Sequence, residues 1–380
     1  MPLLRKVVVA MDSFKGSVSS ETSGMCIAQS VKSLYPACQV EVLCVGDGGE
    51  GSGEILTKAL SGEIIPTRAH DALMRPCCAF YGQLPKGRAI VEFANTCGLA
   101  QLAVHERNPR LTSSYGCGEV IKQAIDAGNK EIVLCLGGSA TNDGGMGLLQ
   151  ALGFRFLDSK GRELPGCGDS LRDVSSIMED DAVSMLAGVR FCILHDVMNP
   201  FYGADGAAYV YAPQKGATEE DVVLLDNGLR NFAYVLEAYG GVDVQRIAGS
   251  GAAGGVAGGC ISLLHADVES GIEYVLRSID FHKHLSGCDL VITGEGRIDS
   301  QSFMGKVLQQ IVYYSNREGV PVIAFAGQVS DDVCAQDYGL HGVYEIHPLG
   351  FPLELAMKKE HTLKHLSECV VRVLDSGEFF

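Results

Sequence analysis

The fold class is decided by residues 6–51, which read KVVVAMDSFKGSVSSETSGMCIAQSVKSLYPACQVEVLCVGDGGEG. Two short apolar runs, at residues 7–11 and 40–45, have the composition of buried strands. Each run is followed by a helical pattern, at residues 19–34 and 50–60. Strands that alternate with helices in this way are typical of a parallel sheet with helices on both faces. The stretch therefore predicts an α/β domain built on a doubly wound parallel sheet.

The same alternation returns near the C-terminus. Apolar runs at residues 289–293, 322–326 and 342–346 are separated by helical stretches. We therefore predict that both chain ends form one Rossmann/flavodoxin-like domain, from residues 1–65 plus 280–380.

The middle of the chain has a different pattern. Extended runs follow one another closely at residues 63–68, 76–83 and 88–93, and the turn Pro85-Lys86-Gly87 joins the last two. Such spacing favours antiparallel pairing. We predict that residues 66–279 form a second, inserted α/β domain with mixed or antiparallel strands, and that the active site lies in the cleft between the two domains.

Charge and composition exclude several classes of protein. The formal net charge is −16 and no Lys/Arg cluster is present, which argues against a nucleic-acid or anionic membrane surface. No apolar run reaches the roughly 18 residues of a membrane span. None of the 14 cysteines stands at CxxC spacing, so buried thiols in a reducing compartment are expected. These features predict a cytoplasmic protein with a small-molecule partner, and they are silent on oligomeric state.

Glycine-rich loops contain most of the candidate ligand-binding residues. The segment GDGGEG at 46–51 formally matches the dinucleotide pattern GxGxxG, with Asp71 as the following acid. Carboxylates at Asp47 and Glu50 would repel a pyrophosphate unless a cation lay between them, so we interpret the loop as metal-binding. A second GxGxxG match, which starts at Gly249, has no convincing strand before it.

Two more loops combine glycines with acids after apolar runs, at residues 137–145 and 293–299. Each loop alone could be a tight turn with a helix-capping Asp. Three together favour phosphoryl transfer, since bare backbone can approach phosphate oxygens while carboxylates hold Mg²⁺. No GxxxxGK[ST] motif is present, which excludes the ordinary P-loop folds. The predicted metal ligands are Asp47, Asp143, Glu295 and Asp299, and the predicted phosphate or substrate contacts are Gly48, Gly49, Gly137, Gly138, Ser139, Thr141, Gly294 and Gly296.

Two further turns offer catalytic groups. The segment DSFKGS at 12–17 follows a predicted strand and supplies Ser13 and Ser17 as predicted substrate or phosphate contacts, together with Lys15, which could screen a transferring phosphoryl group. Asp196 follows another apolar run and could accept the proton of a substrate hydroxyl group. Its alternative role is to cap the turn before Asn199-Pro200.

At these motifs the sequence resembles the bacterial glycerate kinase family of the glyoxylate-pathway or sugar-acid type. The resemblance runs over nearly the whole chain. Its motifs are DSFKGS at 12–17, GDGGEG at 46–51, SSYGCGE at 113–119, GGSATNDGG at 137–145, APQKGA at 212–217, GSGAAGG at 249–255 and ITGEGRID at 292–299.

The resemblance implies two α/β domains, the cofactors ATP and Mg²⁺, and a phosphoglycerate product, typically the 2-phospho isomer. It also places anion contacts on Lys15, Arg297 and Lys306. The chain departs from the family pattern at residues 195–200, where it has lost a second acid, and at residues 71–76. We predict ATP-dependent phosphorylation of D-glycerate, with Lys15, Asp196 and Arg297 as catalytic residues. The alternatives are an NAD-dependent hydroxy-acid dehydrogenase and a ligand-binding protein without turnover.

Overall fold

A computed structural model describes residues 4–14, 16–46, 48–49, 51–179, 182–303 and 306–377. The chain divides into two compact units. Unit 1 comprises Met1–Asp47 and Ile272–Phe380, and unit 2 comprises Gly48–Gly271. Both boundaries lie earlier in the sequence than the predicted ones at residues 65 and 280. Unit 2 therefore includes helix α2 (Ser52–Ala59), which packs against the sheet of that unit.

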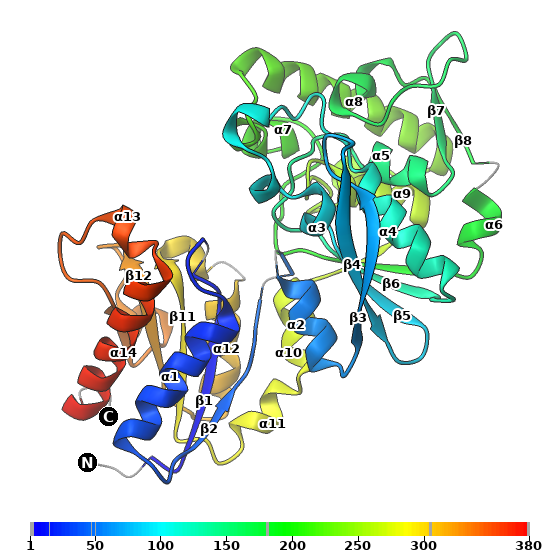
Figure 1. Cartoon of the computed structure of the whole chain (residues 1–380). Helices are drawn as coiled ribbons and strands as arrows, with labels where there is room; N and C mark the ends of the chain where they lie inside the picture. The colour runs from blue at the N-terminus through cyan, green and yellow to red at the C-terminus, as the bar shows by residue number, and fades with distance from the viewer. Residues whose placement is uncertain are drawn as a thin grey trace. The chain divides into compact units, whose positions relative to one another are not determined.

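The sheet of unit 1 is entirely parallel, as predicted for a doubly wound fold (Figure 1). Its five strands lie in the order β13-β12-β11-β1-β2. The N-terminal strand is therefore flanked by β11, which comes from the far end of the chain. The strands are β1 (Lys6–Met11), β2 (Gln39–Val42), β11 (Leu290–Ile298), β12 (Val322–Val329) and β13 (Gly342–Glu345).

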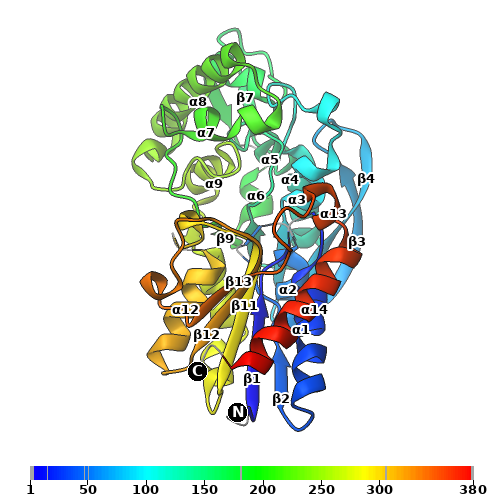
Figure 2. The same ribbon diagram turned by 90° about the vertical axis from the view of Figure 1, so that its left-hand side faces the viewer.

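Helices cover both faces of this sheet (Figure 2). Val7 and Val9 of β1 share one apolar core with Ile27 of α1 and Val370 of α14, so these two helices cover one face. Helix α12 contacts β11 and β12, and its buried side chains do not belong to that core, which places it on the other face. The helices of unit 1 are α1 (Ser20–Leu34), α10 (Gly271–Ser278), α11 (Phe281–Leu285), α12 (Val307–Arg317), α13 (Leu353–Ala356) and α14 (Lys359–Ser376), with 3-10 turns η6 (Ser300–Phe303) and η7 (Ala335–Tyr338).

Unit 2 contains a mixed six-stranded sheet in the order β10-β9-β6-β5-β4-β3. Strand β4 is antiparallel to both of its neighbours, which confirms the predicted antiparallel pairing in the middle of the chain. The other pairs are parallel. The strands are β3 (Glu63–His70), β4 (Pro76–Leu84), β5 (Arg88–Glu92), β6 (Glu131–Cys135), β9 (Arg190–Leu194) and β10 (Asp267–Glu269), and β7 (Arg155–Leu157) pairs separately with β8 (Ser176–Met178).

The helices of unit 2 pack around a single large apolar core. They are α2, α3 (Ala94–Cys97), α4 (Tyr115–Asp126), α5 (Met146–Ala151), α6 (Ala182–Leu186), α7 (Ala207–Tyr211), α8 (Glu219–Gly240) and α9 (Val256–Leu264). Short 3-10 turns lie at η1 (Leu99–Gln101), η2 (Val104–Glu106), η3 (Gly168–Asp173), η4 (Pro213–Lys215) and η5 (Val244–Arg246). Over the described parts of both units, every helix is too short or too polar to cross a membrane.

One predicted loop is largely a strand. Residues 293–299 were expected to leave the sheet, but β11 continues to Ile298 and stays paired with β12, with Glu295 opposite Ala326. The glycine at Gly294 permits this pairing, because a Cβ atom there would lie 1.8 Å from the Phe325 carbonyl oxygen. Glu295 therefore projects from an extended strand, and Asp299 lies just beyond the end of that strand.

The cysteines are all free thiols, as predicted, but six of the 14 are buried and two, Cys78 and Cys334, are exposed. Cys77 is half-buried and Cys78 is exposed on β4, so the adjacent pair faces opposite sides of the strand. Burial raises the pKa of the Cys77 thiol, which disfavours the reactive thiolate. We expect the Cys77→Ser, Cys78→Ser double variant to keep turnover within a few fold of the parent. Complete loss of turnover in a double variant with a normal melting temperature would indicate a redox role.

Candidate functional site

Unit 2 brings two of the predicted glycine loops into backbone contact. A Cβ atom at Gly137 would lie 2.2 Å from the Cα atom of Gly49, so a side chain at Gly137 would force the two backbones apart. Gly48 and Gly49 are buried, whereas Gly138 is exposed and has a φ angle of 67°. The predicted phosphate-binding glycines of the 46–51 and 137–145 loops therefore form one cluster.

Glu92 was not predicted as a site residue, yet it fixes the end of the first of these loops. Its carboxylate accepts hydrogen bonds from the N–H groups of Gly51 (2.8 Å) and Gly53 (3.0 Å), at the start of α2. A pyrophosphate bound in the dinucleotide manner would need these same N–H groups. The available signal in the sequence was an acid inside the apolar run at 89–93. The contact disfavours the dehydrogenase alternative.

Asp143, a predicted metal ligand, is fully buried. One oxygen accepts hydrogen bonds from Ser114 N–H (2.8 Å), Ser114 Oγ (2.7 Å) and Gly147 N–H (3.2 Å). The other accepts one from Gly145 N–H at 3.2 Å. Burial raises the pKa of Asp143, and these hydrogen bonds oppose the rise. The carboxylate thus anchors the 137–145 loop to the start of α4, and metal binding by Asp143 stays a prediction.

Lys215 is a second buried ionisable group at this loop, and it was not predicted as a site residue although the 212–217 motif contains it. Its side chain is 2% exposed, and its Nζ atom lies 2.8 Å from Ser139 Oγ and 2.7 Å from the Thr141 carbonyl oxygen. Burial lowers the pKa of the Lys215 amine, and the nearby Asp143 carboxylate opposes this effect. Thr141 is fully buried while Ser139 is 9% exposed, so of these two predicted contacts Ser139 is nearer to solvent.

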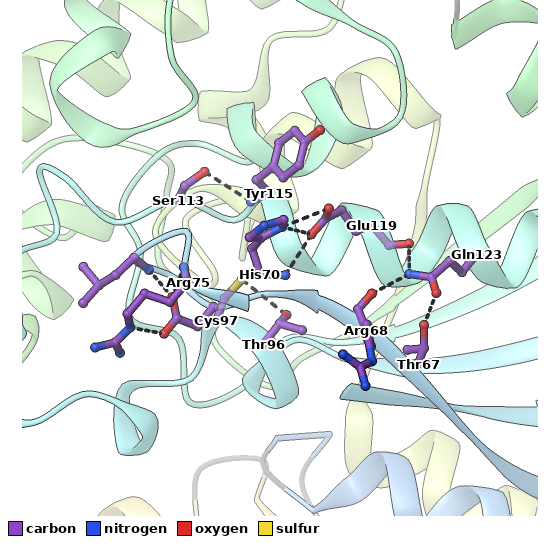
Figure 3. Close-up of polar contacts among 12 residues, drawn as sticks. Thr67, Arg68, His70, Arg75, Thr96, Cys97, Ser113, Tyr115, Glu119 and Gln123 are labelled. Carbon is purple, nitrogen blue, oxygen red and sulfur yellow. Dashed lines mark hydrogen bonds and ion pairs between the residues drawn. The ribbon is translucent and has the colours of Figure 1, made fainter. Parts of the chain in front are cut away.

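The 113–119 motif anchors helix α4 to the end of β3 (Figure 3). The Glu119 carboxylate accepts a hydrogen bond from His70 N–H at 2.9 Å and lies 2.9 Å from His70 Nδ1. A Cβ atom at Gly116 would lie 1.7 Å from the His70 carbonyl oxygen, so the helix can approach only with glycine at this position. Ser113 Oγ accepts a hydrogen bond from Tyr115 N–H at 3.2 Å. The motif is therefore scaffold for the residues around Asp143.

Asp71, the acid that completes the formal dinucleotide pattern, stabilises the turn that follows it. One oxygen accepts hydrogen bonds from the N–H groups of Leu73 and Arg75, both at 2.9 Å. The other oxygen lies 2.6 Å from Arg75 Nε. The departure from the family pattern at residues 71–76 is thus a locally stabilised turn.

Asp196, the predicted base, lies just beyond the end of β9 and contacts the last two residues of unit 2. Its Oδ1 atom accepts hydrogen bonds from Ser270 Oγ (2.6 Å) and from Gly271 N–H (3.0 Å), at the start of α10. These donors lie far in sequence from the turn before Asn199-Pro200 that Asp196 was alternatively expected to cap, and both the role as base and the role at that turn stay predictions. The neighbouring His195 packs against the 249–255 loop, since a Cβ atom at Gly249 would lie 2.2 Å from His195 Cε1. Burial lowers the pKa of His195.

In unit 1 the DSFKGS segment meets β11. Asp12 N–H donates to the Gly294 carbonyl oxygen at 2.9 Å, which places Asp12 beside the strand that carries Glu295. Ser13 N–H donates to Asp12 Oδ1 at 2.7 Å, and Ser17 Oγ lies 2.6 Å from Thr362 Oγ1 on α14. The parallel register therefore brings together the carboxyl end of β1 and the predicted 294–299 site. Asp12 was not among the predicted site residues.

Two of the predicted cations of unit 1, Arg297 and Lys306, are accessible. The Arg297 side chain is 61% exposed, and its Nε atom lies 3.6 Å from Asp299 Oδ2. Lys306 is exposed at the N-cap of α12. Two other predicted residues, Lys15 and Asp47, lie outside the described residues. Among the residues that are described, no group of three or more His, Cys, Asp or Glu side chains is placed to hold a metal ion.

Comparison with known proteins gives one consistent family. The model of the Glycerate kinase family matches residues 7–375. The chain is 39% identical to a glycerate kinase of Bacillus subtilis, over 95% of this chain and 94% of the relative. It is 37% identical to the glycerate 2-kinase of Escherichia coli, over 90% of each. A crystal structure described as glycerate kinase 2 from Salmonella typhimurium LT2 matches with a TM-score of 0.82 and 34% identity, over 99% of this chain and 100% of that one.

These matches, which span almost the entire chain together with its fold, place the protein among the kinases. It belongs to the glycerate kinase family. The family resemblance inferred from the motifs is thereby confirmed, as is the prediction of an enzyme of the transferase class.

Proposed function

We propose that this protein transfers the γ-phosphoryl group of ATP to D-glycerate, and that the 2-hydroxyl group is the acceptor. The whole-chain match to the glycerate kinase family carries the proposal. The Escherichia coli relative is named a glycerate 2-kinase, and this favours the 2-phospho product over the 3-phospho product. A ³¹P NMR spectrum of the product tests the choice, because the two phosphoglycerate isomers give distinct signals. A pure 3-phosphoglycerate signal would contradict it.

The residues of each unit suggest separate tasks. In unit 2, the exposed backbone at Gly138 and the Ser139 hydroxyl group offer donors to an anionic ligand. In unit 1, Arg297 and Lys306 offer accessible cations. We further propose Asp196 as the group that accepts the hydroxyl proton, with Ser270 and Gly271 holding one carboxylate oxygen in place. The expected location of the active site between the two domains stays a prediction.

The donor chemistry of unit 1 fits a magnesium ion. Asp12 directly follows β1 and Glu295 belongs to the neighbouring parallel strand β11, and hard divalent cations prefer carboxylate oxygens. Mg²⁺ is commonly held by one or two carboxylates together with substrate phosphates, so a cage of three protein ligands is unnecessary. Glu295, Asp299 and Asp12 are the described residues that we propose for this role, with Asp47 as a further candidate. When bound, the ion would neutralise the phosphate charge.

Turnover is expected to require both D-glycerate and Mg²⁺, because acidic side chains repel an unshielded polyphosphate. ADP formation should fall to background in excess EDTA and return when MgCl₂ is added beyond the chelator. Omission of D-glycerate should abolish it in the same assay. Undiminished turnover in EDTA would contradict the proposed metal dependence.

A further inference from the structure

Lys215 is placed rigidly by the fold. It ends the 3-10 turn η4, and its own N–H donates to the Ala212 carbonyl oxygen at 3.0 Å. The next residue, Gly216, has a φ angle of 96°, and a Cβ atom there would lie 2.3 Å from the Arg107 carbonyl oxygen. The backbone at Gly216 is already in contact with the Arg107 carbonyl group, so the backbone at Lys215 cannot move closer to it. The position from which the Lys215 side chain extends is therefore fixed.

The amine makes both of its observed hydrogen bonds to the 137–145 loop, although Lys215 lies more than seventy residues away in sequence. The Thr141 carbonyl oxygen can only accept a hydrogen bond, so Lys215 donates there. In its protonated form the Lys215 amine carries donors and no acceptor, so the Ser139 hydroxyl oxygen also accepts a hydrogen bond from it. The hydroxyl hydrogen of Ser139 must then point to a different acceptor.

We propose that Lys215 is a positioning residue for phosphoryl transfer, which holds Ser139 and Thr141 in place and commits the Ser139 hydroxyl group to donate toward the bound anion. This inference rests on the proposed function, because it takes the 137–145 loop as part of the ligand site. Ser139 is less deeply buried than Thr141 and directly follows the exposed Gly138, so a ligand that contacts the backbone at Gly138 lies next to this residue. The ligand class is a phosphate or carboxylate anion, which takes hydroxyl donors readily.

Without the Lys215 amine, nothing at that position obliges the Ser139 hydroxyl hydrogen to point toward the ligand. The hydroxyl group can then donate to nearby carbonyl oxygens of the protein, since a serine hydroxyl rotates to suit its surroundings. The Lys215→Met variant keeps most of the side-chain volume and removes the donor. If Lys215 acts through Ser139, its removal has little further effect once the hydroxyl group is absent. This coupling separates a positioning role from a general loss of structure.

The test is a double-mutant cycle with Lys215→Met, Ser139→Ala and the combined variant in the full-length protein. We expect each single variant to lower kcat/KM for D-glycerate by about 10- to 100-fold, the usual effect of losing one oriented donor. The combined variant should lie within about threefold of Ser139→Ala, because coupled residues are non-additive. Lys122→Met, an exposed lysine on α4, is the matched control and should resemble the parent.

Three results would overturn the inference. In the first two, either Lys215→Met or Ser139→Ala keeps kcat/KM within about threefold of the parent. In the third, the losses of kcat/KM in the two single variants multiply fully in the combined variant. If Lys215→Met does not fold, Lys215→Gln takes its place in the cycle, and the Ser139→Ala result stands by itself. Calorimetric titration of each variant with ATP and with D-glycerate gives a second readout. If the parent protein makes no phosphoglycerate, the proposed function is contradicted. The ligand affinities of the four proteins, measured by calorimetry, would still decide the role of Lys215.

Discussion

Asp143→Ala is expected to lower the free energy of unfolding by about 3–5 kcal/mol, the usual cost of removing one partner from a buried polar cluster. The carboxylate is fully buried and accepts hydrogen bonds from Ser114, Gly145 and Gly147. Alanine leaves these donors unsatisfied and takes away the negative charge near the buried Lys215 amine. Few single substitutions in this protein should destabilise it more.

Urea or thermal unfolding, followed by circular dichroism, measures the loss. Asp126→Ala is the matched control, because Asp126 is exposed on α4 in the same unit and should change stability by no more than about 0.5 kcal/mol. The same experiment separates the two roles of Asp143. If the variant keeps the stability of the parent but its turnover no longer responds to Mg²⁺, the carboxylate is a metal ligand and not an anchor.

Local patterns in the sequence predict the elements of this fold well. The Pro85-Lys86-Gly87 turn indicated a hairpin, and both Lys86 (φ 65°) and Gly87 (φ 70°) adopt the left-handed conformation that reverses the chain between β4 and β5. The alternating runs at the two chain ends likewise form one parallel sheet. These features depend on residues that are close in sequence, and so local sequence patterns can predict them.

The division into units depends on tertiary contacts, which local patterns do not contain. Helix α2 follows β2 along the chain, and so it was grouped with the N-terminal domain. In the structure it packs on β4 and β5. Gly82 and Gly53 permit this packing, because Cβ atoms there would lie 1.8 Å from Thr57 Oγ1 and 3.0 Å from Glu92 Cβ. Close approaches of this kind involve single glycines that no periodic pattern marks.

The candidate site was predicted through its glycine loops, and its supporting residues were not. Glu92 and Lys215 act on loops that lie more than thirty residues away in sequence. The roles of both residues depend on the fold, which buries each of them against partners that the local sequence does not identify. Glu92 was visible as an acid within an apolar strand, but an acid in that setting does not name its partner.

Lys15→Met is expected to lower kcat by about 10²–10³, which corresponds to about 3–4 kcal/mol of transition-state stabilisation. Phosphoryl transfer spreads negative charge over the migrating group, and a fixed cation stabilises that charge more in a water-poor site than in solution. On either side of Lys15, Phe14 and Val18 exchange two backbone hydrogen bonds of 2.8 and 3.0 Å. Ser17 is tied to Thr362 on α14. These contacts fix the neighbouring backbone from both directions.

Steady-state kinetics distinguish this role from simple attraction of the glycerate carboxylate. An anchor for the substrate would stabilise ground state and transition state alike, so its loss would raise KM and leave kcat unchanged. Lys364→Met is the matched control, since Lys364 is 67% exposed on α14 and should leave both constants unchanged. The melting temperature of Lys15→Met should move by only a few degrees. An unchanged kcat with a raised KM for D-glycerate would assign Lys15 to substrate binding and refute its role in the transition state.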